Sequence, residues 1–485
     1  MVSNGAMGAI VEPREELLRR FYARELADDG RFFVGVVSTG IYCRPSCRAR
    51  SPRPENVRFF ASERDARAAG LRPCRRCRPD LHERVDADRQ RLRALAARVR
   101  SDPPRWRDVH ALSTELETGA TKLNALFRHD YHLTPAAFLA RARVERAMEL
   151  LARERSGVLE AGEASGFESA STFHENFAAL TGLTPGAYRD LGPPGFTVRL
   201  AESGRTRELR AFFGRDARGR TERVGEDRLQ KALVLDGVPL VLDLALGARS
   251  VDVSLTAGRP IARESWFRAH RIAMRWLGLE SDAPAFERRA ARSPDIARLV
   301  HGRTGLRIPR STDVFEGLVW VVVGAQVNVA FAARCRAALV ELAGTPAPDG
   351  FVAHPAAEHV ARLEPADLVR CQFSRRKAEY LIDAARAIVA GELDLEALRS
   401  EPVSLVAERL SAVRGLGPWS VQYLLLRAYG FEDCAPAGDV ALAEALRRFH
   451  DRPERPESAE VTELMKPFAP HRSLATYHLW NSLRP

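Results

Sequence analysis

The sequence predicts a multidomain α+β protein. Its 485 residues suffice for about three domains of roughly 150 residues each, and a hydrophobic content of 45% allows several cores. Four of the seven cysteines gather near the N-terminus. Strand patterns occur in residues 32–60 and 196–255, whereas residues 86–189 and those after 266 have helical patterns. A small α/β domain, an all-α region, a mixed α/β lobe and a mainly α-helical domain are therefore expected in this order.

The charge balance favours a polyanionic partner. The formal net charge is +11 and the pI is near 9.7, and lysine and arginine gain by displacing counterions from phosphates. A merely basic surface is the alternative that charge leaves open. The first residues have no basic segment followed by an apolar one, and no apolar run reaches the roughly 18 residues of a membrane span. A cytoplasmic protein is expected, in which clustered cysteines indicate metal binding or thiol chemistry rather than disulfides.

Three stretches separate the expected parts. Residues 78–80 precede a charged helix expected over residues 83–100, residues 191–195 (LGPPG) form a turn-rich linker, and a softer boundary falls around residues 280–284. The expected domains are residues 10–80, 84–190, 195–282 and 283–485.

Local patterns predict several elements of the two mixed parts. Strands are expected over residues 32–37 and 57–60, and a short helix over 62–69 with Ser62 as its N-cap and Gly70 at its end. In the second mixed part, strands are expected over residues 196–200, 232–235, 240–244 and 250–255.

The clustered cysteines form two short pairs, Cys43 with Cys47 and Cys74 with Cys77. Two such pairs separated by a folded segment can build a tetrahedral thiolate site for one Zn²⁺. The spacing alone favours a purely structural zinc site, which is the commoner class.

The sequence around these cysteines is similar to the sensor domain of the Ada family of methyl-transfer repair proteins. The similarity lies in TGIYCRPSCRAR at residues 39–50, ENV at 55–57 and AGLRPCRRCRPD at 69–80. In that family the first cysteine of the first pair is a zinc ligand that takes a methyl group from a DNA methylphosphotriester. The resemblance therefore implies that Cys43 is the methyl acceptor, that all four cysteines bind one Zn²⁺, and that no organic cofactor is needed.

Methylation at this site is expected to act as an electrostatic switch. Four thiolates and one Zn²⁺ carry two net negative charges, which repel DNA, and methylating one sulfur leaves a single negative charge. DNA affinity should then rise. The phosphate contacts expected around the cluster are Arg44, Arg48 and Arg72.

A doubled pattern lies in the helical middle of the chain. Its copies close with HLTPAAF at residues 132–138 and GLTPGAY at 182–188. A small-residue turn between two short helices is typical of a helix-turn-helix, and GFESASTFHENF at residues 166–177 resembles the AraC family of regulators. The resemblance implies a transcription activator with promoter DNA and RNA polymerase as partners; a helical bundle without DNA contact is the alternative. The predicted groove-facing residues are Lys122, Asn124 and Arg128 in the first copy and Ser169, Ser171, Thr172 and His174 in the second.

The phrase VRGLGPWSV at residues 413–421 has the form of a hairpin between two helices. Gly415 and Gly417 would let backbone amides approach a phosphate, although a plain helix-joining turn has the same form. An apolar helix expected over residues 422–430 follows. The next phrase, PAGDVAL at 436–442, makes the whole segment resemble the helix-hairpin-helix superfamily of DNA glycosylases.

In that superfamily the catalytic aspartate matches Asp439. A buried carboxylate near the sugar would stabilise the oxocarbenium-like charge that develops as the N-glycosidic bond breaks, and it could orient the attacking water. Asp439 also suits the N-cap of a helix expected over residues 440–448, and the two roles are compatible.

The aromatic residues near the hairpin indicate the type of reaction. Bifunctional glycosylase/lyases of this superfamily have a Schiff-base lysine after Gly417-Pro418, where this chain has Trp419. The resemblance therefore implies monofunctional hydrolysis that leaves an abasic site. Trp419, Tyr423 and Trp480 match pocket aromatics of the AlkA branch (3-methyladenine DNA glycosylase II), where rings stack on an electron-poor alkylated purine.

Two further segments resemble AlkA. The strands of residues 196–255 match its N-terminal lobe. Residues 315–330 resemble the helix that carries its DNA wedge, and Gln326 aligns with the wedge residue, but GAQVN at residues 324–328 departs from the usual family sequence.

Together the resemblances imply a DNA alkylation repair protein that combines a methyl-acceptor domain and a damage-responsive transcription regulator with a base-excising glycosylase. The alternative is a DNA-binding transcription factor whose glycosylase half is catalytically inactive. An acidic residue at position 439 and an intact hairpin favour the enzyme.

Overall fold

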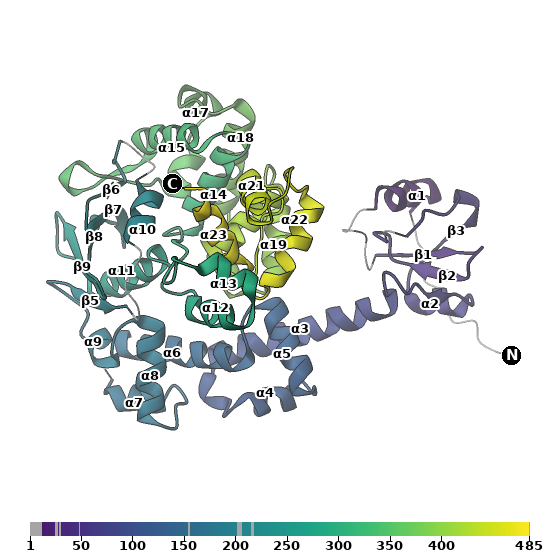
Figure 1. Cartoon of the computed structure of the whole chain (residues 1–485), viewed down its shortest axis with the longest axis horizontal. Coiled ribbons are helices and arrows are strands. Elements are labelled where there is room, and N and C mark those ends of the chain that lie inside the picture. The colour runs from purple at the N-terminus through teal and green to yellow at the C-terminus, as the bar shows by residue number, and fades with distance from the viewer. Residues whose placement is uncertain are drawn as a thin grey trace. The chain divides into compact units, whose positions relative to one another are not determined.

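The computed structural model describes residues 12–24, 28, 31–47, 49–153, 156–200, 206–214 and 218–484. The chain forms two compact units, residues 1–94 and residues 95–485 (Figure 1). Among the described helices, none combines the length and the apolar character that a membrane span requires.

The first unit contains a four-stranded sheet with the order β3-β1-β2-β4. Its strands are β1 (Phe33–Val36), β2 (Ile41–Cys43), β3 (Val57–Phe60) and β4 (Arg72–Pro73). Strand alternation sends Val34 towards helix α1 (Arg14–Ala23) and Phe33 towards helix α2 (Glu63–Ala68). The two predicted strands and the predicted short helix are confirmed, and the Ser62 hydroxyl caps α2 by accepting a hydrogen bond from the Asp65 amide at 3.1 Å.

Helix α3 (Pro79–Ser101) differs from the prediction at its start. Residues 78–80 were expected to be a joint before a helix at 83. Instead Arg78 takes a left-handed conformation (φ 44°) and the helix begins directly at Pro79, because proline is well suited to the first helical turn.

The helical middle consists of six helices between residues 109 and 189. They are α4 (Val109–Glu115), α5 (Ala120–Asp130), α6 (Pro135–Arg153), α7 (Val158–Glu163), α8 (Ala170–Thr181) and α9 (Pro185–Arg189). The short pairs α4–α5 and α7–α8 coincide with the two predicted copies. The long helix α6 lies between the pairs and packs on α8 and α9.

A five-stranded antiparallel sheet follows, with the order β5-β9-β8-β7-β6. Its elements are β5 (Phe196–Arg199), α10 (Thr206–Phe213), β6 (Glu222–Val224), β7 (Arg228–Leu235), β8 (Val238–Leu246), β9 (Ser250–Ala257) and α11 (Arg263–Trp276). The four predicted strands are present. The turn between β7 and β8 is Asp236-Gly237, both with positive φ (49° and 72°), a geometry that this residue pair favours in hairpins.

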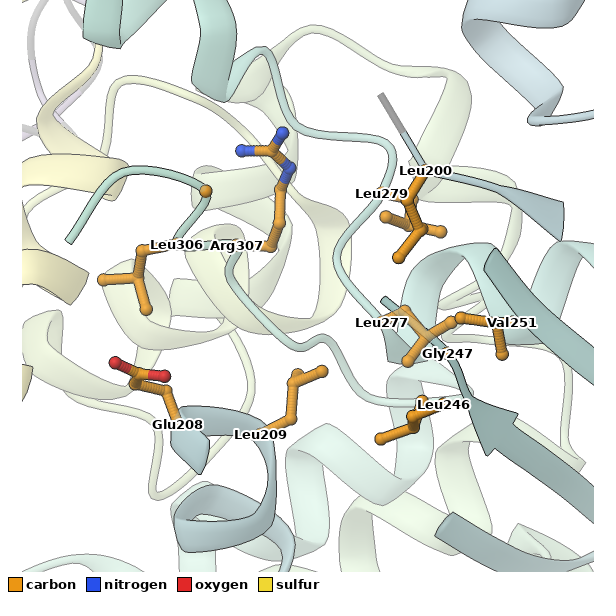
Figure 2. Close-up of a pocket in the computed structure, with 11 residues that line it drawn as sticks. Leu200, Glu208, Leu209, Leu246, Gly247, Val251, Leu277, Leu279, Leu306 and Arg307 are labelled. Atoms are coloured by element: carbon orange, nitrogen blue, oxygen red, sulfur yellow. The ribbon is translucent and has the colours of Figure 1, made fainter. Parts of the chain in front are cut away.

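Helix α11 joins this lobe to the helical middle. Its Trp266 and Phe267 share one core with Phe173, Phe177 and Tyr188 of the helix-turn-helix region. A small apolar pocket of about 30 Å³ lies between α10, the sheet and residues 305–307 (Figure 2). That pocket is too small for a nucleobase and contains none of the predicted site residues.

The C-terminal part, green to yellow in Figure 1, is helical around one large core. Its helices are α12 (Ala283–Arg289), α13 (Pro294–Val300), α14 (Val314–Gly324), α15 (Val329–Ala343), α16 (Ala357–Ala361), α17 (Pro365–Arg370), α18 (Arg375–Val389), α19 (Val403–Ser411), α20 (Pro418–Leu424), α21 (Val440–Phe449), α22 (Ser458–Met465) and α23 (Arg472–Ser482). Strands β10 (Thr345–Pro346) and β11 (Val352–Ala353) form a minimal hairpin.

Candidate functional site

The four clustered cysteines are brought together by strand pairing. Strands β2 and β4 run parallel, with Tyr42 opposite Pro73, so Cys43, which ends β2, and Cys74, which follows β4, lie side by side. The Cys74 amide donates a hydrogen bond to the Tyr42 carbonyl at 2.9 Å. The turns after the two strands bring Cys47 and Cys77 next to Cys43 and Cys74. All four sulfur atoms lie within 4.8 Å of one another.

This geometry fits a tetrahedral metal site. Zinc–sulfur bonds of about 2.3 Å separate tetrahedral sulfurs by roughly 3.8 Å. Cys43, Cys47 and Cys74 are buried and Cys77 is half-buried. Hydrogen bonds to Cys47 and Cys77 and burial raise the pKa of the Cys43 thiol far above its usual range. A cation is therefore needed for all four sulfurs to ionise together.

The arginines predicted to contact phosphates around this cluster differ in their exposure to solvent. Arg72 is exposed on β4, whereas Arg44 is half-buried directly after Cys43. Arg48 lies outside the described residues. The exposed guanidinium of Arg72 is thus available to a phosphate.

The predicted hairpin joins α19 to α20. Gly415 has φ 92°, and a Cβ atom there would lie 2.3 Å from the Tyr380 ring, so only glycine fits. Gly417 is the N-cap of α20, and the region around its Cα is open. The open backbone at Gly417 can approach another molecule closely, as the sequence predicted for a phosphate.

Asp439 caps helix α21 and is held by two indoles. Its Oδ1 accepts hydrogen bonds from the Leu442 amide at 2.7 Å and from Trp480 Nε1 at 2.9 Å, and its Oδ2 accepts one from Trp419 Nε1 at 2.9 Å. The N-cap prediction is confirmed. The carboxylate is half-buried rather than buried, because it sits at a helix end next to exposed Gly438. Three N–H donors fix its orientation while one side stays accessible.

The predicted pocket aromatics stand together around this carboxylate. The Tyr423 ring centroid lies 5.4 Å from that of Trp419 and 5.9 Å from that of Trp480, with interplanar angles of 38° and 37°. Trp320, which the sequence did not indicate, donates from Nε1 to the Tyr423 hydroxyl at 3.1 Å. Its only sequence signal was its place in the apolar stretch of residues 315–330.

The segment expected to carry a DNA wedge is not one helix. Helix α14 ends at Gly324 and α15 begins at Val329, and Gln326 lies exposed in the loop between them with a left-handed φ of 58°. Asn328 starts the second helix because its side chain accepts a hydrogen bond from the Phe331 amide at 2.8 Å. Lys377, which sequence reasoning missed, donates to the Val323 and Ala325 carbonyls, both at 2.7 Å, and so fixes this loop.

The predicted groove-facing residues lie mostly on exposed helix faces. Lys122 and Asn124 of α5 and Thr172 and His174 of α8 are exposed, and Arg128 is half-buried. Ser171 is exposed and donates to Glu175 at 3.3 Å. Ser169 instead caps α8, since its hydroxyl accepts a hydrogen bond from the Thr172 amide at 3.4 Å.

Comparison with known proteins gives three family matches along the chain. Residues 16–80 match the metal-binding domain of Ada, residues 112–190 match a helix-turn-helix domain, and residues 319–470 match the HhH-GPD superfamily of base excision DNA repair proteins. The matched segments contain the cysteine cluster, the paired short helices and Asp439.

Individual relatives have the same parts. A probable bifunctional transcriptional activator/DNA repair enzyme AlkA of Mycobacterium tuberculosis is 28% identical over 500 residues, covering 97% of this chain and 96% of that protein. A DNA-3-methyladenine glycosylase of Bacillus subtilis is 31% identical over 47% of this chain and 77% of its own length. The fold is shared with the 3-methyladenine DNA-glycosylase from Archaeoglobus fulgidus, with a TM-score of 0.54 at 22% identity over 60% of this chain and 98% of that one.

Proposed function

Since this chain belongs to the DNA-3-methyladenine glycosylase family and carries an Ada-type metal-binding domain and a helix-turn-helix domain before it, we propose that it repairs alkylated DNA and regulates transcription in response to alkylation. The C-terminal part would hydrolyse the N-glycosidic bond of alkylated bases of the 3-methyladenine type. The carboxylate of Asp439, held by two indole N–H groups amid three aromatic rings, is the observation that carries this proposal.

In base excision, the aromatic rings would stack on a flipped, electron-poor base while Asp439 faces the sugar. The fixed carboxylate would stabilise the positive charge that develops on the sugar as the glycosidic bond breaks, and would orient the water that attacks the anomeric carbon. Trp419 cannot form a Schiff base, so the reaction would stop at an abasic site. Gly415, Gly417 and Gln326 would contact the DNA around that site.

In the first unit, Cys43, Cys47, Cys74 and Cys77 would hold one Zn²⁺, whose charge keeps the sulfurs ionised. The Cys43 sulfur would attack the methyl carbon of a DNA methylphosphotriester. The S–C bond forms as the C–O bond breaks, and the released phosphodiester keeps the electron pair and its negative charge. Loss of one negative charge near Arg44, Arg48 and Arg72 would tighten DNA binding.

The helix-turn-helix pairs would place α5 and α8 against promoter DNA through exposed Lys122, Ser171 and Thr172, with Arg128 beside them. RNA polymerase is the partner that a transcription activator of this kind would recruit, and these activities would operate in the cytoplasm.

A glycosylase assay tests the central proposal. The purified chain is incubated with methylated duplex DNA, and free bases and abasic sites are measured. Release of 3-methyladenine without strand cleavage is expected. Tight DNA binding without any base release would instead favour a transcription factor with an inactive glycosylase half.

Peptide mass spectrometry tests the methyl acceptor. After incubation with DNA that contains methylphosphotriesters, one methyl group is expected on Cys43. A methyl group on Cys47, Cys74 or Cys77 would contradict the residue assignment, and an unmodified cluster would reduce the domain to a structural zinc site.

A further inference from the structure

The loop between α14 and α15 has apolar side chains in solvent beside Gln326. Gln326 and Val327 are exposed in the loop, and Val329 is exposed at the start of α15. The two valines are 36% and 50% exposed. Proteins that part stacked bases insert apolar side chains between them, because such groups suit the flat faces of the bases. The tip formed by Gln326 and Val327 therefore suits insertion into a base stack.

Both ends of this loop are held by side chains. Lys377 Nζ donates hydrogen bonds to the carbonyls of Val323 and Ala325, both at 2.7 Å. Carbonyls at the end of a helix lack partners within the helix, and a cation there also suits the helix dipole. At the other end Asn328 caps α15. Between the two anchors Gln326 keeps a left-handed φ of 58°, which residues other than glycine rarely adopt, so the anchors determine where its side chain projects.

A hollow of about 420 Å³ lies beside the loop. It is lined by Gln326 and Val327 of the loop, by the rings of Phe331 and Phe373, and by Lys377. Well-packed side chains hold a segment in place, whereas open space of this size leaves a segment room to move. The position of the loop on this side therefore depends on the two hydrogen bonds from Lys377.

The helix that carries Lys377 also contacts the hairpin. Helix α18 packs on α14 (Figure 1). Its Tyr380 ring fills the space beside Gly415, where a Cβ atom would lie 2.3 Å from the ring, and its Asp383 pairs with Arg414 at 3.1 Å. Lys377 and Tyr380 are three residues apart and so lie on one side of the helix. One helix therefore contacts both segments for which DNA contact is proposed, the loop and the hairpin.

We propose that Lys377 is a positioning residue for base flipping, which holds the loop so that Gln326 and Val327 face the base stack while the hairpin holds the DNA backbone. The inference rests on the proposed base excision, because a base within a duplex must leave the stack before it can reach Asp439. Unpairing and unstacking cost free energy in a duplex, whereas a single-stranded base is already free to turn out. Lys377 should therefore be important for duplex DNA and unimportant for single strands.

A comparison of two substrates tests this role. Release of 3-methyladenine is measured from methylated duplex DNA and from methylated single strands. For Lys377→Met, the duplex rate relative to the single-strand rate should fall about tenfold, since a small misplacement of a positioning group can cost up to roughly 10²-fold. Lys377→Arg keeps a cationic donor and should recover part of the ratio. The control Lys466→Met, at an exposed lysine paired with Glu463, should keep the wild-type ratio. An unchanged ratio in Lys377→Met, or an equal fall on both substrates, would overturn the proposal.

Fluorescence of 2-aminopurine provides a second measurement that does not depend on catalysis. This base becomes brighter when it is unstacked, and it is placed next to a stable tetrahydrofuran analogue of an abasic site in duplex DNA. Saturating wild-type protein should raise the fluorescence, and Lys377→Met should raise it less. Gln326→Asn, which shortens the exposed side chain and tolerates a left-handed φ, should also raise it less. No rise with the wild type, or an equal rise with all three proteins, would overturn the proposal. If the wild type releases base from neither substrate, the proposed glycosylase fails, while the fluorescence comparison still decides the role of Lys377.

Discussion

Asparagine at position 439 separates the two roles that the geometry gives to Asp439. Asparagine is as good an N-cap as aspartate, so its oxygen can keep the hydrogen bonds from the Leu442 amide and Trp480 Nε1. Its amide group, however, replaces Oδ2 and meets the indole N–H of Trp419, which is also a donor. The variant thus keeps the cap, loses the negative charge and leaves one donor unsatisfied.

The expected magnitudes follow from these contacts. Loss of a fixed charge that stabilises the transition state lowers the rate by about 10²–10³-fold or more, whereas the retained cap limits the loss of stability to about 1 kcal/mol. Single-turnover excision of 3-methyladenine from duplex DNA measures the first quantity, and chemical denaturation measures the second. Asp439→Ala is the matched comparison, because it removes both the charge and the cap.

One result would refute this reasoning. If Asp439→Asn excises the base at close to the wild-type rate while Asp439→Ala unfolds more easily, Asp439 is only a helix cap. The carboxylate would then have no part in catalysis, and the competing interpretation of a DNA-binding protein with an inactive glycosylase half would gain support.

Further predictions concern one contact of Asp439, the metal and the pH dependence of stability. Trp480→Phe replaces the indole with a smaller aromatic ring that lacks the N–H donor to Asp439, so excision should slow about tenfold. Trp106→Phe makes the same replacement at a buried indole away from the site and should leave the rate unchanged. Metal analysis should find one zinc per chain in the freshly purified protein and markedly less in Cys77→Ser; equal zinc in both would contradict the four-sulfur site. Burial lowers the pKa of His270 from 6.5 to about 4, so the unfolded chain takes up its proton at a higher pH than the folded chain. The stability that neutral His270 provides is complete above pH 6.5 and is lost as the pH falls towards 4. Between pH 7 and pH 5, the free energy of unfolding should therefore fall by about 2 kcal/mol less in His270→Gln than in the wild type, as measured by denaturation at both pH values.

The sequence predicted elements whose cause is local. Ser62 and Asp439 each precede a helix and cap it through the amide three residues later, so short-range chemistry sets both helix starts. The strands at residues 33–36 and 57–60 have β-branched and aromatic side chains that alternate between two faces of the sheet. In contrast, β2 and β4 are only three and two residues long, too short for any periodicity, although their pairing aligns the cysteines.

The features that sequence reasoning missed depend on partners far along the chain. Lys377 reaches back 54 residues to the Val323 carbonyl and fixes a loop within a segment that resembles a single helix of AlkA. The helix ends at Gly324 because Ala325 takes an extended conformation, and Gln326 then turns the backbone left-handed.

The same physics hides from the sequence a buried ion network in which Lys231 and Arg336 both donate to Glu222 and Glu316. Lys231 donates a hydrogen bond to Glu316, which is 85 residues further along the chain. In the sequence, each of the two residues is indistinguishable from an ordinary surface charge. Arg427 lies in an apolar helix, where a single arginine is usually expected to reach solvent. Only the packing of α10 on this helix shows that its guanidinium is enclosed over Phe212.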